Sequence, residues 1–270
     1  MSVARPDGLP DFLNPPLNEV VMGVQFSRPK GYQQIYAGQV WQLFKDQYPV
    51  VQEQPALPPA FETFGLQQQI FPPPPGFGFF SGAMHDRFWF LTSKGEELLQ
   101  FQEDKLLHNW RKIGDETNEY PRFESVIDRF GDELGKLQEF MTTLSGQQLL
   151  INQCEVSYIN HIVFTEALPT PQHWLNFVNF QSISPNDVSM VLRETILDDE
   201  QRPQARLTYE ISIGQKSGQQ MMNLGITFRG IPKTPNLPDV LAFLNAGRLR
   251  IVTRFAEITT TAAHEYWGKK

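Results

Sequence analysis

The spacing of apolar residues divides the first half of the chain into strands and helices. Apolar residues at alternate positions, typical of a strand with one buried face, begin with Val20, Met22, Val24 and Phe26. Residues 32–48 instead carry apolar residues at steps of three and four, which predicts a helix that Pro49 ends. Further strands are predicted at residues 62–71, 77–84, 86–93, 97–103 and 105–112. The clearest helix follows, with helical apolar spacing from Phe123 to Leu144.

The second half of the chain repeats this order. A long strand at residues 154–165 precedes a short helix at 171–180. Three more strands are predicted at 187–197, 204–213 and 220–229. Helical spacing then returns from Leu237 to Ile258. We expect Thr260 or Thr261 to cap a last short helix that ends at Trp267-Gly268.

Both halves therefore contain a strand, a helix, several antiparallel strands and a long helix. We predict an α+β fold of two similar lobes in tandem, residues 1–150 and 151–270, packed together as one unit. Each lobe would be an antiparallel sheet backed by helices. This order of elements resembles the TATA-binding-protein fold and, less closely, helix-grip ligand-binding domains. Because no motif is shared, the resemblance implies shape alone.

The composition supports a buried core. Of the 270 residues, 40% are hydrophobic and 20% are charged, which excludes a disordered chain or a coiled coil. One cysteine, Cys154, excludes a disulfide framework and a cysteine-rich zinc site. No apolar run approaches the ~18 residues of a membrane span, and the first residues lack the apolar core of a signal peptide. We therefore expect a cytoplasmic protein that does not enter a membrane.

Charge is spread unevenly between the two halves. The net charge is −7, and residues 1–150 carry all of it, with 12 basic and 19 acidic residues. Residues 151–270 are neutral, with 11 of each. Phosphate contacts need surplus Lys and Arg, so general nucleic-acid binding is disfavoured. A local anion site in the neutral second lobe stays open.

Motifs for catalysis, cofactors and metals are weak in this sequence. The glycines around Gly76-Phe77-Gly78 lack both the spacing and the strand-to-helix turn of a dinucleotide loop. Cys154 and His161 have metal-ligand chemistry, but seven residues along one strand place them on opposite faces. His264-Glu265 lacks the second His of a helical metalloprotease motif. We therefore predict no catalytic residue, no metal and no cofactor.

The strands of the second lobe separate an apolar face, expected to pack on the helices, from a polar one. Arginines together with His and Glu on one sheet face can hold an anionic or polar partner through charge-assisted hydrogen bonds. The candidate ligand-binding residues are His161, Arg193, Arg206, Glu210 and Arg229. The alternative is a solvated face, on which each cross-strand pair contributes only ~0.2–1 kcal/mol.

Several strings carry a resemblance to a known family. They are N-P-P-L-N-E-V at residues 14–20, L-Q-F-Q at 99–102, N-W-R at 109–111, Y-P-R-F-E at 120–124 and A-A-H-E-Y-W-G at 262–268. Together they resemble a sporadically distributed, functionally uncharacterised prokaryotic protein family of about this length. The resemblance covers nearly the whole chain and implies no catalytic residues. The patchy distribution of such a family favours mobile-element, toxin–antitoxin or defence contexts.

The leading hypothesis is a non-enzymatic cytoplasmic interaction protein that binds a protein partner or itself. The alternative is a ligand or nucleic-acid binder that uses the polar face of the second lobe, which requires Arg193, Arg206 and Arg229 to converge. An enzymatic function would require a pocket where His161 or His173 meets a carboxylate.

Overall fold

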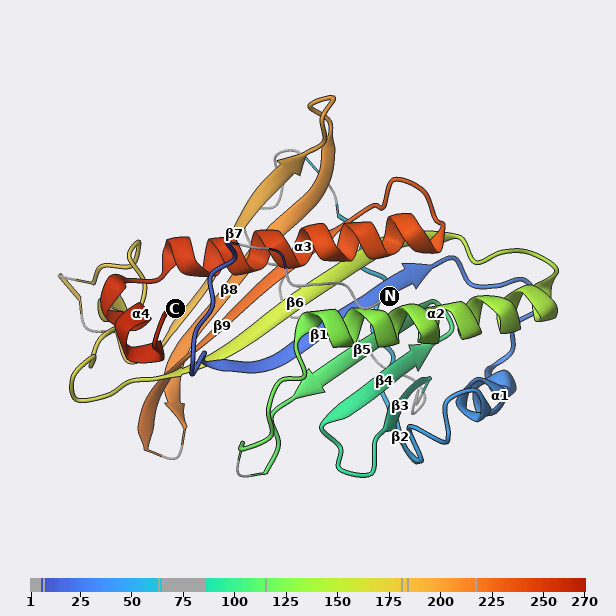
Figure 1. Ribbon diagram of the computed structural model, residues 1–270, viewed down its shortest axis with the longest axis horizontal. Helices are drawn as coiled ribbons and strands as arrows, with labels where there is room; N and C mark the ends of the chain where they lie inside the picture. The colour runs from blue at the N-terminus through green and yellow to red at the C-terminus, as the bar shows by residue number, and fades with distance from the viewer. Residues whose placement is uncertain are drawn as a thin grey trace, which may run out of the picture.

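One antiparallel sheet forms the frame of the protein in a computed structural model that describes residues 6, 8–62, 64, 86–114, 116–180, 182–183, 185–216 and 218–270. Nine strands of these residues pair in the order β2-β3-β4-β5-β1-β6-β9-β8-β7 (Figure 1). The strands are β1 (Leu17–Phe26), β2 (Val50–Gln54), β3 (Arg87–Leu91), β4 (Glu97–Gln102), β5 (Lys105–Arg111), β6 (Ile151–Val163), β7 (Val188–Leu197), β8 (Pro203–Lys216) and β9 (Gln219–Gly230).

The prediction of two lobes, each with its own helix-backed sheet, is wrong. β1 and β6 lie side by side in antiparallel register from Leu17 opposite Asn160 to Phe26 opposite Ile151. This pairing joins the strands of both halves into a single sheet, and the fold is mostly sheet. The physical reason is that the edge of a sheet carries unpaired backbone N–H and C=O groups. Two separate sheets would leave one edge of β1 and one of β6 unpaired, whereas their union satisfies both rows of backbone groups.

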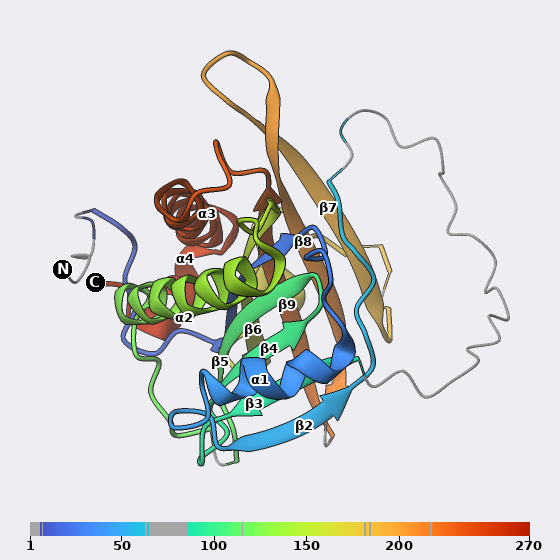
Figure 2. The same ribbon diagram turned by 90° about the vertical axis from the view of Figure 1, so that its right-hand side faces the viewer.

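Two long helices cover one face of the sheet. α2 (Phe123–Ser145) and α3 (Leu237–Ile258) lie next to each other on this side, as Figures 1 and 2 show. We call it the helix face and the opposite side the polar face. The shorter helices are α1 (Ala37–Gln42) and α4 (Thr261–Trp267), and two 3₁₀ turns span Gln34–Tyr36 and Pro171–His173. The core fills the space between the helices and the sheet.

Local sequence explains where the helices begin and end. The apolar stripe of α2 is buried as its spacing predicts, and Gly146 ends the helix in the left-handed conformation at φ 70°. Asn236 caps α3 by accepting a hydrogen bond from the backbone N–H of Asp239 at 2.9 Å. Thr260 caps α4 in the same way, through Ala263 at 3.1 Å, which confirms one of the two predicted caps.

Four other predicted elements differ from the structure or lie outside it. The helix predicted at residues 32–48 shortens to the 3₁₀ turn and α1, because residues 43–47 form only turns. The helix predicted at 171–180 is a single 3₁₀ turn. The strands predicted at 62–71 and 77–84 lie almost wholly outside the described residues, and Glu62 belongs to no strand. β2 was not predicted, since Pro49 and the short, exposed run after it gave no strand signal.

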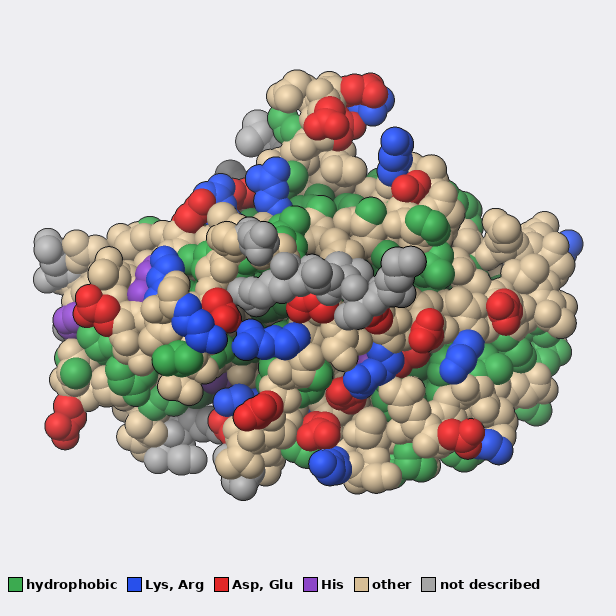
Figure 3. Space-filling view, viewed as in Figure 1, with side chains coloured by type: hydrophobic (Ala, Val, Ile, Leu, Met, Phe, Trp, Pro, Cys, Tyr) green, Lys and Arg blue, Asp and Glu red, His purple; other side chains and the backbone are tan. Residues whose placement is uncertain are grey.

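A crossing segment, residues 55–62, leaves β2 and runs over the polar face on the side away from α2 and α3 (Figure 2). On the helix side of the molecule, basic and acidic side chains are interspersed on the surface (Figure 3). Among the described residues, every helix is too short or too polar to cross a membrane.

Candidate functional site

The polar face carries all five candidate residues, as their alternation in the sequence predicts. Arg206 of β8 lies opposite Arg229 of β9, and Arg229 lies opposite Glu155 of β6. Neighbouring strands are about 4.8 Å apart, so these three side chains form one row across the sheet. Two arginines in a row would repel each other unless an anion lies between them.

That anion is a carboxylate of the protein itself. Glu62, at the end of the crossing segment, places Oε2 3.1 Å from Nε of Arg206 and Oε1 3.5 Å from Nη1 of Arg229. The side chains of Arg206 and Glu62 are only 7% and 12% exposed, so this contact is largely removed from water. Glu155 accepts a second bond from Nε of Arg229 at 2.7 Å. Charge-assisted bonds of this kind are about twice as strong as neutral ones.

Electrostatics and ring contacts add to the same site. Burial lowers the pKa of Arg229, but the Glu155 and Glu62 carboxylates outweigh burial and hold that pKa above its ordinary value. The guanidinium of Arg206 also lies 5.6 Å from the ring centroid of Phe64, in cation–π contact. Arg229 therefore stays charged, and the two arginines hold the Glu62 carboxylate from two sides.

The remaining candidates do not join this cluster. Arg193 on β7 is exposed and lies two residues, about 7 Å, along the strand from the residue opposite Arg206. Glu210 lies four residues further along β8 than Arg206, about 13 Å away. His161 lies opposite Asn223, six residues or about 20 Å along β6 from Glu155. The structure brings together Arg206 and Arg229, but Arg193, Glu210 and His161 lie elsewhere on the polar face.

Sheet side chains also hold the backbone of the crossing segment. The side-chain amide of Gln102 bonds both main-chain groups of Leu57: the N–H donates to Oε1 at 2.8 Å, and the carbonyl accepts from Nε2 at 2.9 Å. The N–H of Ala60 donates to Oε1 of Gln25 at 2.8 Å. A cavity of about 200 Å³ remains between the segment and the sheet. All three of these bonds are made to main-chain groups of the segment rather than to its side chains.

In the described part of the chain, the geometry gives little support to a metal site or to a catalytic nucleophile. No group of three or more His, Cys, Asp or Glu side chains there could hold a metal ion. Burial raises the pKa of the Cys154 thiol well above its ordinary value, so it stays protonated and is a poor nucleophile. Nδ1 of His173 bonds the hydroxyl of Thr170 at 2.6 Å rather than a carboxylate.

Sequence reasoning missed two features of the site and its surroundings. Glu62 was not recognised as a site residue because its segment was predicted to be a strand. Nothing in the local sequence connects it to Arg206 and Arg229, which lie more than 140 positions later in the chain. His108 was also not singled out from the sequence. It lies on the apolar face of β5, where its Nδ1 is 2.8 Å from Oε2 of Glu133. A polar residue at a core-facing strand position was the available signal. His108 is fully buried, which favours a bracing role for that pair.

No family model matches this chain, and no curated protein sequence matches it either. The resemblance to a sporadic prokaryotic family therefore stays a prediction. Two of the strings that carry the resemblance are in contact in the fold. Nδ2 of Asn109, in N-W-R, donates a hydrogen bond to Oε1 of Glu19, in N-P-P-L-N-E-V, at 2.6 Å.

Proposed function

We propose that this protein is a non-enzymatic binding protein whose polar face holds an extended, acidic segment of a protein partner. In this proposal the partner segment replaces the protein's own crossing segment. The observation that carries it is the Glu62 carboxylate held between Arg206 and Arg229. A carboxylate buried between two arginines supports the proposal that a partner's carboxylate can take the same place.

The backbone contacts support a peptide rather than a small acid. Gln102 and Gln25 bond main-chain groups three residues apart, at Leu57 and Ala60. Glutamine amides that bond main-chain N–H and C=O groups accept any extended peptide, while the arginine pair selects a carboxylate further along. Affinity then comes from the backbone and specificity from charge, as in other modes of peptide recognition.

Peptide binding to a variant with a weakened crossing segment tests this proposal. The double substitution Ala60→Pro and Glu62→Ala removes the backbone donor to Gln25 and the carboxylate, both from the segment itself. A fluorescent decapeptide with the sequence of residues 55–64 should bind this variant, as measured by anisotropy. The same peptide with Gln in place of its Glu should bind more than about tenfold more weakly, because the buried arginines then lose their anion.

The wild-type protein and Glu53→Ala serve as controls. Glu53 is an exposed glutamate on β2 outside the site. Both proteins should bind the peptide weakly, because their own segment competes at an effective concentration of about millimolar. If the double variant does not fold, Glu62→Ala alone is used. Equal binding of the Glu and Gln peptides would contradict the proposal. A dimer that forms without any peptide binding would assign the face to a second copy and would also overturn it.

A cytoplasmic location is part of the proposal. The single buried thiol, Cys154, supports it, since reducing compartments keep such cysteines unpaired.

A further inference from the structure

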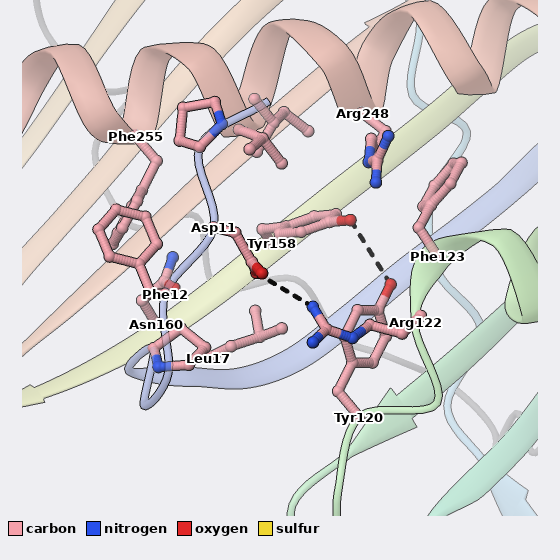
Figure 4. Close-up of a pocket in the computed structure, with 14 residues that line it drawn as sticks. Asp11, Phe12, Leu17, Tyr120, Arg122, Phe123, Tyr158, Asn160, Arg248 and Phe255 are labelled. Carbon is pink, nitrogen blue, oxygen red and sulfur yellow. Dashed lines mark hydrogen bonds and ion pairs between the residues drawn. The ribbon is translucent and has the colours of Figure 1, made fainter. Parts of the chain in front are cut away.

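A second cavity lies on the helix face, far from the crossing segment. It measures about 90 Å³ and lies between residues 10–17, the start of α2, the strand β6 and the helix α3 (Figure 4). Its walls are mainly apolar and include Leu17, Ile251 and Phe255, each at most 8% exposed. An engineered apolar cavity of ~150 Å³ binds benzene, so this smaller one suits a short acyl chain rather than a ring.

Hydrogen-bond donors gather at one end of this cavity. The hydroxyls of Tyr120 and Tyr158 lie 3.5 Å apart (Figure 4). Burial raises the pKa of both, so each keeps its proton to donate. Arg248 lines the same end and is 3% exposed. Its Nη2 donates to Oε1 of Glu124 at 2.8 Å, but its Nε is buried with no hydrogen-bond partner in the described part of the chain.

An unpartnered N–H of a buried guanidinium is costly. A buried polar group without a partner loses about 1–3 kcal/mol, and more when it is charged. The Nε of Arg248 can recover this loss from an acceptor in the cavity beside it. Only one of the two tyrosine hydroxyls can donate to the other, so the second hydroxyl proton can donate to the same acceptor.

Residues 10–12, before β1, form one wall of this cavity and are held by ion pairs. Asp11 bonds Nη1 of Arg122 at 3.2 Å and Nζ of Lys270 at 3.0 Å. Arg122 has φ 72° and ψ 149°, a backbone conformation that is essentially restricted to glycine and costs of order 1–3 kcal/mol. Strain of this kind persists where the surroundings require it, and it occurs often beside ligand sites.

We propose that this cavity binds a small amphipathic carboxylate, with its carboxyl group at Tyr120, Tyr158 and Arg248 and its apolar part against Leu17 and Phe255. One carboxylate oxygen accepts from the tyrosine hydroxyls and the other from Nε of Arg248. The guanidinium is then shared between Glu124 and the ligand. Because the walls are apolar and the volume is small, a phosphate ester or a peptide does not fit this chemistry.

Two of the strings noted in the sequence supply much of the cavity. Pro15 and Leu17 come from N-P-P-L-N-E-V, while Tyr120 and Phe123 come from Y-P-R-F-E. These strings are about 100 residues apart in the chain, and neither contains a residue of the Glu62 site. The proposal is therefore independent of the peptide-binding function.

Binding of 3,3,3-trifluoropropionate to the full chain tests this inference by ¹⁹F NMR titration. We expect saturable binding to the wild-type protein, and binding of the neutral 3,3,3-trifluoropropanol at least about tenfold more weakly. Tyr158→Phe removes one donor and keeps the ring, so it should weaken binding of the acid about tenfold. Tyr209→Phe is the matched control: it removes a buried tyrosine hydroxyl outside the cavity, bonded to Glu194 at 2.8 Å, and should leave binding unchanged.

A second variant keeps the test decisive if Tyr158→Phe does not fold. Val252→Phe fills the cavity from α3 and should abolish binding while circular dichroism still shows the native fold. The inference is overturned if the wild-type protein shows no saturable binding. It is equally overturned if the alcohol binds as well as the acid, or if Val252→Phe binds as well as the wild type.

Discussion

The two faces of the sheet bury different kinds of side chain. On the helix face, Val20, Met22 and Val24 are fully buried under α2 and α3, and stability comes from apolar area removed from water. On the polar face, Gln100 and Asn109 are 7% and 4% exposed, yet both are amides. Both faces therefore bury side chains. They differ in that the buried groups of the helix face are mainly apolar, whereas those of the polar face need hydrogen-bond partners.

A chain of hydrogen bonds makes burial on the polar face possible. Nη1 of Arg87 donates to Oε1 of Gln100 at 2.7 Å, and Nε2 of Gln100 donates to Oδ1 of Asn109 at 2.8 Å. Asn109 in turn donates to Glu19. Each amide accepts from one neighbour and donates to the next, so the side-chain amides of Gln100 and Asn109 are both paired.

The largest expected effect comes from breaking a buried polar cluster on the helix face, formed by Glu133, Tyr48 and His108. Glu133 accepts from the hydroxyl of Tyr48 at 2.5 Å and bonds His108 at 2.8 Å. Glu133→Ala removes this partner from Tyr48 and His108, both of which remain buried in the core. It should lower the free energy of unfolding by about 3 kcal/mol, measured by urea denaturation. Glu139→Ala, on an exposed position of the same helix, should change it by less than about 0.5 kcal/mol. Similar losses in the two variants would mean that the cluster adds nothing to packing.

A smaller loss is expected on the polar face. Gln102→Ala leaves the main-chain N–H of Leu57 without its partner and leaves the carbonyl only the longer bond from Nζ of Lys105 at 3.4 Å. It should lower the free energy of unfolding by about 1–3 kcal/mol. The same urea experiment measures it, with Gln52→Ala on an exposed position of β2 as the control. If Gln102→Ala unfolds like its control, water replaces the lost bonds and the crossing segment is only loosely held.

The smallest effect depends on pH. Burial raises the pKa of Glu19 above its ordinary value of 4.5, although Asn109 and Arg111 counter part of that rise. A raised native-state pKa means that the wild type loses stability as the pH rises through it. Glu19→Gln removes this loss, so its melting temperature should exceed that of the wild type at pH 7, with the difference shrinking below pH 4.5. Glu53→Gln should show no such trend, and a lower melting temperature for Glu19→Gln at pH 7 would reverse the assignment.

The sequence predicted local features well and long-range ones poorly. Apolar spacing located α2 and α3 and most strands, because each pattern depends on a few neighbouring residues. The alternation of β8 and β9 also placed Arg206 and Arg229 on one face. The single sheet was missed because spacing says nothing about which strand lies beside β1. Glu62 was missed for the same reason, since its partners are distant in the chain and meet it only after folding.

The central position of β1 has a consequence for biosynthesis. Gly23 pairs with Leu107 on one side and with Glu155 on the other, 84 and 132 residues later in the chain. At roughly 5–20 residues per second, the ribosome needs on the order of ten seconds to make the second partner. During that time β1 is an apolar strand with a free edge, so the nascent chain depends on chaperones or on shielding by its own later hairpins.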